Sequence, residues 1–98
     1  VVMEYNLVAC PELYARIGQA MGISGYGSGP VEMARRAVAA VRSLSNDLGI
    51  PKNLKELGVE KDTFEAMTDD AMKSGNIPVN PRKTSHADIL RLFEKAYA

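Results

Sequence analysis

Apolar residues recur along this chain at steps of three and four, the spacing that brings side chains onto one face of an α-helix. After Pro11, for example, the pattern runs through Leu13, Ile17, Ala20 and Met21. No run shows the strict alternation of apolar and polar residues that is typical of a half-buried β-strand. The sequence therefore predicts an all-α fold, a small bundle of about five helices. They are expected at 11–21, 30–48, 53–58, 60–73 and 86–96.

Proline and glycine indicate where these helices begin and end. Pro11 and Pro30 suit the first helical position, where the missing N–H costs no hydrogen bond. Gly22 and Gly49 suit the residue that follows a last turn, because glycine readily adopts the left-handed conformation found there. Clusters of glycine and proline also predict two loops, over 22–29 and 75–84.

The two ends of the chain carry further signals. Ser85, followed three residues later by Asp88, resembles a capping box at the start of the last helix. The chain begins without methionine, and residues 1–6 read as the last turns of a helix. We therefore expect a piece of a larger protein. Its missing part is expected to cover apolar surface around Val1, Val2, Tyr5 and Leu7.

Composition narrows the class of protein. Twelve basic and twelve acidic residues balance, so no net field attracts nucleic acid or an anionic membrane. No apolar run approaches the roughly 20 residues that cross a bilayer. Cys10 is the only cysteine, which excludes an internal disulfide and fits a reducing compartment. The expected protein is soluble and cytoplasmic, with neither nucleic acid nor membrane as a partner.

The glycine-rich stretch over 25–29 (GYGSG), just before the helix expected at 30–48, permits two interpretations. Glycines at a helix N-terminus let backbone N–H groups approach a phosphate. A dinucleotide fingerprint, however, needs a preceding strand, and a P-loop needs a following Lys-Ser or Lys-Thr pair. Neither is present, so the sequence favours a plain connector over a phosphate site.

Other polar and sulfur-containing residues also favour structural roles. His86 is the only histidine, and a metal site needs several ligands. Cys10 precedes a helix, whose positive end favours a thiolate, but no histidine lies nearby in sequence to support a nucleophile. The methionines fall mostly on apolar stripes and indicate core packing. A solvated helix face is the favoured interpretation of the acidic residues Glu60, Asp62, Glu65, Asp69 and Asp70.

Several short motifs follow one another in a fixed order. They are 1–6 (VVMEYN), 11–17 (PELYARI), 48–51 (LGIP), 54–59 (LKELGV) and 80–85 (NPRKTS). Each motif alone is weak. The ordered set resembles the C-terminal end of the iron-containing (group III, metal-dependent) alcohol dehydrogenase family, and the resemblance runs over the whole chain.

That resemblance implies a two-domain parent enzyme with a dehydroquinate synthase-like fold. An α/β domain would bind NAD or NADP, and an all-helical domain would hold a divalent metal, iron or zinc. Residues 1–98 would form the C-terminal portion of the helical domain. In the family one aspartate and three histidines bind the metal, and none of these ligands can be assigned here. Neither catalytic nor cofactor-binding residues can be assigned either, so the isolated chain is expected to be inactive.

For the parent, the resemblance implies that the metal polarises an alcohol oxygen while hydride passes to the nicotinamide ring. The substrate would be a small alcohol or aldehyde, and a homo-oligomer is left open. Asn76, Ile77 and Val79 match a family segment near the substrate pocket. The turn over 80–82 (NPR) is interpreted as docking the last helix, in preference to contacting substrate. The alternative function is a stand-alone helical module that binds other proteins through an apolar groove.

Overall fold

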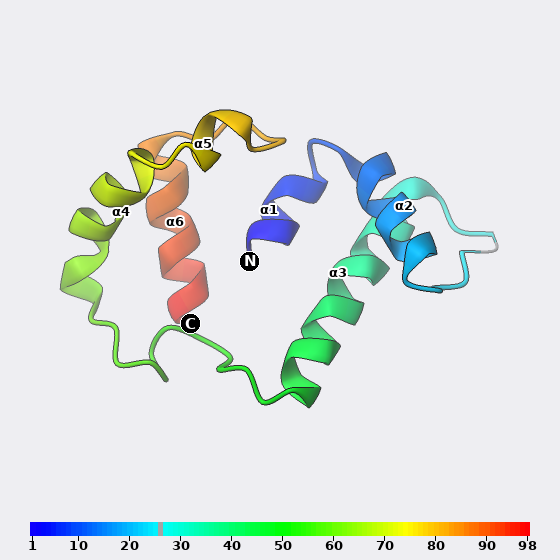
Figure 1. Cartoon of the computed structure of the whole chain (residues 1–98), viewed down its shortest axis with the longest axis horizontal. Helices are drawn as coiled ribbons and strands as arrows, with labels where there is room; N and C mark the ends of the chain where they lie inside the picture. Colours follow the sequence, from blue (N-terminus) through cyan, green and yellow to red (C-terminus); the bar gives the residue numbers. More distant parts are fainter. Residues whose placement is uncertain (26) are drawn as a thin grey trace. The chain divides into compact units, whose positions relative to one another are not determined.

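The computed structural model describes residues 1–25 and 27–98, and this part of the chain contains helices and turns but no strand. The predicted all-α fold is confirmed. No helix in the described ranges is long and apolar enough to cross a membrane. In chain order the elements are α1 Val2–Leu7, α2 Pro11–Ala20, α3 Pro30–Asp47, the 3₁₀ helix η1 Lys61–Thr63, α4 Phe64–Met72, α5 Asn76–Val79 and α6 His86–Tyr97 (Figure 1).

The chain divides into two compact units, one over Val2–Ile50 and one over Pro51–Ala98 together with Val1. In the first unit α2 lies beside α3, and α1 contacts both (Figure 1). Leu7, Tyr14, Ala34 and Val38 form its buried core, with Met3 and Cys10 packed against them. Leu7 was expected at an exposed surface, which is wrong, because α1 turns this side chain inward and leaves it only 8% exposed.

Small residues allow α2 and α3 to approach closely. Gly18 of α2 and Ala37 of α3 are both buried. A Cβ atom added to Gly18 would lie 3.3 Å from the Ala37 Cβ and 3.3 Å from the Met33 carbonyl oxygen. Both distances are tighter than most real contacts of this kind, so the helix pair is fitted to a residue without a side chain at position 18.

The face of α2 that packs on α3 is not the predicted apolar stripe. Tyr14, Ala15 and Gly18 are the buried residues of α2. Leu13 and Ile17 remain 53% and 42% exposed. The bounds of α2 were predicted to within one residue. The predicted apolar stripe, however, packs against no other element in the described part of the chain.

In the second unit α4 lies beside α6. Phe64 is 5% exposed, and its ring centroid lies 6.2 Å from that of Phe93 and 5.6 Å from that of Tyr97. Thr68 is fully buried, and its hydroxyl donates to the Phe64 carbonyl at 2.7 Å. Aromatic packing therefore holds α4 against α6, while the buried Thr68 hydroxyl is satisfied within α4 itself.

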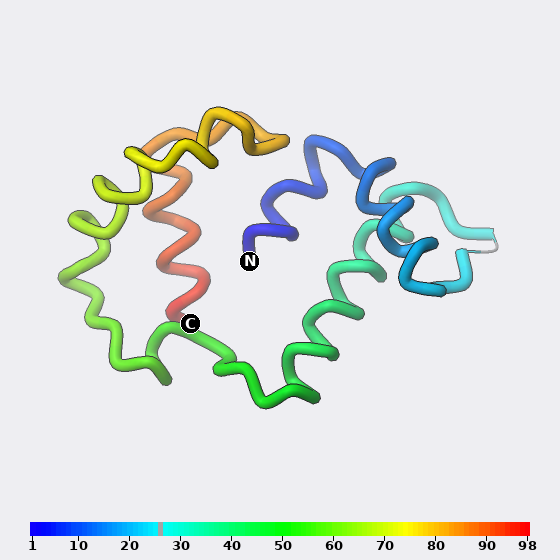
Figure 2. The backbone as a smooth tube through the Cα atoms, in the orientation of Figure 1, coloured from blue at the N-terminus to red at the C-terminus, as the bar shows by residue number. Residues whose placement is uncertain are grey.

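Two predictions for the second unit are wrong. The helix expected over 53–58 is a set of turns, visible in Figure 2 as an irregular segment between α3 and η1. Its bonds run from Leu57 N–H to the Leu54 carbonyl and from Gly58 N–H to the Lys55 carbonyl, three residues back. Gly58 then takes a φ of 79°, which ends the turn. The bonded residues are three apart and not four, so the segment forms turns in place of an α-helix.

The other wrong prediction is the loop over 75–84, which contains the one-turn helix α5. Pro78 was expected to exclude helix there. All four residues of α5 lie in a first turn, where a missing N–H costs no hydrogen bond, so proline is tolerated. The helix expected over 60–73 begins as η1 and continues as α4.

Candidate functional site

The predicted pocket residues Asn76, Ile77 and Val79 lie together on α5. Val79 is 76% exposed, Asn76 is also exposed, and Ile77 is half-buried. Ser74 anchors the turn, because its hydroxyl accepts from the Asn76 N–H at 3.2 Å and its carbonyl accepts from the Ile77 N–H at 3.2 Å. The structure thus presents three adjacent side chains on one short, hydrogen-bonded turn.

The turn that follows α5 is held by side chains. The Asn80 side-chain amide donates to the Arg82 carbonyl at 2.7 Å and to the Thr84 hydroxyl at 3.2 Å. The Thr84 hydroxyl donates to the same Arg82 carbonyl at 2.8 Å. These bonds hold the turn in one conformation. That the turn docks the last helix, in preference to contacting substrate, stays a prediction.

The start of α6 is fixed by the predicted capping box, which is confirmed. The Asp88 N–H donates to the Ser85 hydroxyl at 3.2 Å, and the Ser85 N–H donates to an Asp88 carboxylate oxygen at 2.9 Å. The backbone and side-chain hydrogen bonds from Ser85, together with the bond from Arg91, lower the pKa of Asp88 to about 2. The hydrogen bonds at the start of α6 therefore favour the ionised form of Asp88.

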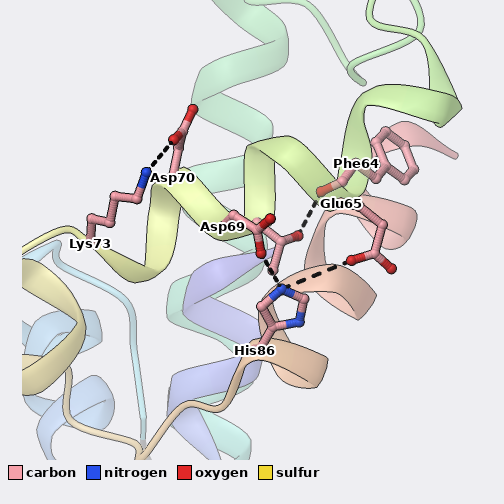
Figure 3. Close-up of polar contacts among 7 residues, drawn as sticks. Phe64, Glu65, Asp69, Asp70, Lys73 and His86 are labelled. Carbon is pink, nitrogen blue, oxygen red and sulfur yellow. Dashed lines mark hydrogen bonds and ion pairs between the residues drawn. The ribbon is translucent and has the colours of Figure 1, made fainter.

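His86 does more than the sequence predicted. Its Nε2 atom lies 2.8 Å from Asp69 Oδ1 and 3.9 Å from Glu65 Oε2, so it links α6 to α4 (Figure 3). The sequence predicts a solvated face for these carboxylates, and both side chains are indeed largely exposed. Their four-residue spacing, which places them on one side of α4, is the signal that could have indicated a shared partner.

These residues do not fit a metal ion. In residues 1–25 and 27–98, no group of three or more His, Cys, Asp or Glu side chains could hold one. The Nε2 atom of His86 is within hydrogen-bond distance of Asp69, and the Glu65 oxygen is well beyond it. The cluster is an exposed polar contact between two helices, and no step of a reaction is derived through it.

The remaining candidate sites are Cys10 and the glycine-rich stretch over 25–29. The Cys10 thiol donates to the Asn6 carbonyl at 3.5 Å and packs against the core of the first unit, as expected of a packing residue. Within 25–29, the Ser28 N–H donates to the Gly25 carbonyl at 2.9 Å. Tyr26 lies outside the described residues, so the choice between connector and phosphate site stays a prediction for this stretch.

Comparison with known proteins identifies relatives over nearly the whole chain. The model of the Fe-containing alcohol dehydrogenase family, C-terminal, matches residues 1–97. The 1,3-propanediol dehydrogenase of Klebsiella pneumoniae is 41% identical over 96 residues, which is 98% of this chain. The lactaldehyde reductase of Escherichia coli (strain K12) is 34% identical over the same share.

A solved structure agrees with these relatives. The crystal structure of a 1,3-propanediol oxidoreductase matches 98% of the chain with a TM-score of 0.94 and 41% identity. In each of these comparisons the chain covers only 25% of the longer protein. The chain therefore spans about a quarter of the length of the relatives that it matches.

Proposed function

The chain belongs to the Fe-containing alcohol dehydrogenase family, and from this we propose that it forms the C-terminal portion of the helical domain of a metal-dependent alcohol dehydrogenase. The parent enzyme would interconvert small alcohols and their aldehydes or ketones by hydride transfer to and from NAD or NADP. The observation that carries the proposal is the 41% identity over 98% of the chain.

The proposed division of function within the parent starts from the side chains of the described residues. The described part of the chain has no group of side chains able to hold a metal. The metal ligands, the iron or zinc ion and the nucleotide-binding loop are therefore assigned to the part of the parent outside the chain. The contribution of the chain is to shape and support the substrate pocket.

The proposed substrate class rests on the names of two relatives and on the exposed side chain of Asn76 in α5. The relatives are named for 1,3-propanediol and lactaldehyde, both three-carbon compounds with two oxygen atoms. Asn76 presents an exposed amide on α5, and an amide can donate to or accept from a hydroxyl group. We place α5 at the wall of the pocket, where Asn76 would meet the second oxygen of a short diol or hydroxyaldehyde.

The test is Asn76→Leu in the full-length enzyme that carries this chain. The ratio of kcat/KM for 1,3-propanediol to that for 1-propanol should fall by an amount equivalent to about 1–3 kcal/mol, while the affinity for the nicotinamide cofactor stays nearly unchanged. Asn46→Leu is the matched control, since Asn46 is also exposed but lies on α3. An unchanged ratio in Asn76→Leu, with lower thermal stability alone, would show that α5 is a connector.

A further inference from the structure

Helix α2 has two apolar faces, and only one of them is buried in the part of the chain that the structure describes. Tyr14, Ala15 and Gly18 are buried in the first unit. On the other face Leu13 is 53% exposed, and Ile17 and Met21 are each 42% exposed. Isolated exposed apolar residues are normal in proteins, but a second continuous row on a helix that is already packed is a different feature.

We call the row of Leu13, Ile17 and Met21 the α2 stripe. Its geometry suits the packing of a second helix against α2. Its members are spaced by four residues, so they lie along one side of the helix over about 12 Å at a rise of about 1.5 Å per residue. A shallow hollow lies beside them, lined by Leu13, Arg16, Ile17 and Ala20. Because Ala20 is small, the hollow can receive a side chain from a neighbouring helix, as ridges pack into grooves.

We infer that the α2 stripe is the packing surface for an amphipathic helix from the part of the parent enzyme outside this chain. The inference rests on the proposed function. The 1,3-propanediol oxidoreductase structure shares the fold of this chain at a TM-score of 0.94, and this chain covers only 25% of it. The remaining three quarters supply an occupant within the same polypeptide.

The positive charge of Arg16 predicts a further property of the helix that packs on the α2 stripe. Arg16 lines the hollow, is exposed, and has no ion pair among residues 1–25 and 27–98. A helix seated on the α2 stripe would bring its polar edge close to this guanidinium. The helix is therefore expected to carry apolar residues at steps of three and four and a carboxylate at its edge that pairs with Arg16.

The experiment measures thiol accessibility at position 17. Ile17→Cys is made in a Cys10→Ser background, both in the 98-residue chain and in a chimaera in which this chain replaces the last quarter of the K. pneumoniae 1,3-propanediol dehydrogenase. Labelling by a maleimide is followed at the level of peptides by mass spectrometry. Labelling at position 17 should be at least tenfold slower in the chimaera than in the isolated chain.

The matched control is Glu12→Cys, since Glu12 is exposed on the same helix but lies away from the α2 stripe. It should label equally fast in both proteins. Equal rates at position 17, or slow labelling at both positions in the chimaera, would overturn the assignment. Protection of position 17 in the isolated chain that grows with its concentration would also overturn it, in favour of a second copy. If Ile17→Cys lowers helicity by circular dichroism, Met21→Cys replaces it.

Activity of the same chimaera separates this inference from the proposed function. Protection at position 17 without oxidation of 1,3-propanediol would support helix packing on the α2 stripe while counting against the proposed activity. Oxidation of 1,3-propanediol with fast labelling at position 17 would overturn helix packing on the α2 stripe and leave the proposed activity intact.

Discussion

Ser85 and Asp88 show how much two side chains can determine at the start of a helix. Each accepts a hydrogen bond from the backbone N–H of the other, so two donors that α6 would leave unpaired are satisfied. The sequence was sufficient to predict this arrangement, because a capping box depends only on residues three positions apart.

Removing the serine hydroxyl should weaken the start of α6. Ser85→Ala leaves the Asp88 N–H without its partner, and we expect unfolding to become easier by about 1 kcal/mol, measured by chemical denaturation. Ser43→Ala is the matched control. Ser43 is exposed within α3, where alanine is the better helix former, so the denaturation midpoint should stay the same or rise slightly. Equal losses in both variants would contradict the capping role.

The ionisation of Asp88 makes the same helix start sensitive to acid. The pKa of Asp88 is lowered from 3.8 to about 2, first by the backbone hydrogen bond from Ser85. Because the folded pKa lies below the ordinary value, the stabilisation is fully present above about pH 4 and is lost as pH falls towards 2. Thermal unfolding from pH 6 to pH 2 should show a smaller acid-induced loss in Asp88→Asn than in the wild type. Parallel curves would contradict the prediction.

Among whole elements, those with local start and stop signals were predicted and the others were not. Pro11, Pro30 and Ser85 each mark a first turn, and the structure begins α2, α3 and α6 where they indicate. The turn over 53–58 had comparable capping signals, because Asn53 does accept from the Glu56 N–H. That segment nevertheless forms turns with bonds between residues three apart, and the Leu54 N–H donates to the Ala96 carbonyl of α6. A bond to a residue 42 positions away is not visible in local sequence.

The contact between α2 and α3 predicts a penalty for any large side chain at position 18. Gly18→Val should destabilise the fold by about 1–3 kcal/mol, because the added atoms meet Ala37 and the Met33 carbonyl. Ala20→Val enlarges an exposed position of the same helix and should cost less than about 0.7 kcal/mol through helix propensity. Urea denaturation measures the loss of stability in each of the two variants. Equal midpoints would show that α2 and α3 can move apart without loss of stability.

The contact between α4 and α6 predicts a weak coupling. A double-mutant cycle with His86→Ala and Asp69→Ala should give about 0.2–1 kcal/mol, since both side chains are exposed and water screens their interaction. Asp70→Ala is the control in place of Asp69→Ala, because Asp70 pairs with Lys73. A coupling of several kcal/mol would mean that the cluster is desolvated in solution.

For the molecule as a whole, we expect the 98-residue chain alone to bind neither the metal nor the nicotinamide cofactor of its family. The reason is the set of side chains in the described part of the chain, which offers no group of metal ligands. Titration calorimetry with ferrous iron, zinc, NAD and NADP measures this directly. Micromolar affinity for any of the four would contradict the division of function proposed above.

The family could be predicted from the order of motifs, whereas the burial of α2 could not. Motif order is a property of the chain itself. Which face of α2 is covered depends on what packs against it. The row through Leu13 and Ile17 is the more apolar in sequence, but the row through Tyr14 and Gly18 is the one that meets α3. The same holds for α5, because a pocket wall is defined by the group that it faces.

The close fit of α2 on α3 at Gly18 also bears on the time course of folding. These helices are neighbours in sequence, joined by residues 21–29, and a loop of about ten residues closes in roughly 10–100 ns. Contacts between sequence neighbours form fast because little chain entropy is lost in closing them. We expect the α2–α3 hairpin to be among the first structures to form, so Gly18→Val should slow refolding as well as speed unfolding.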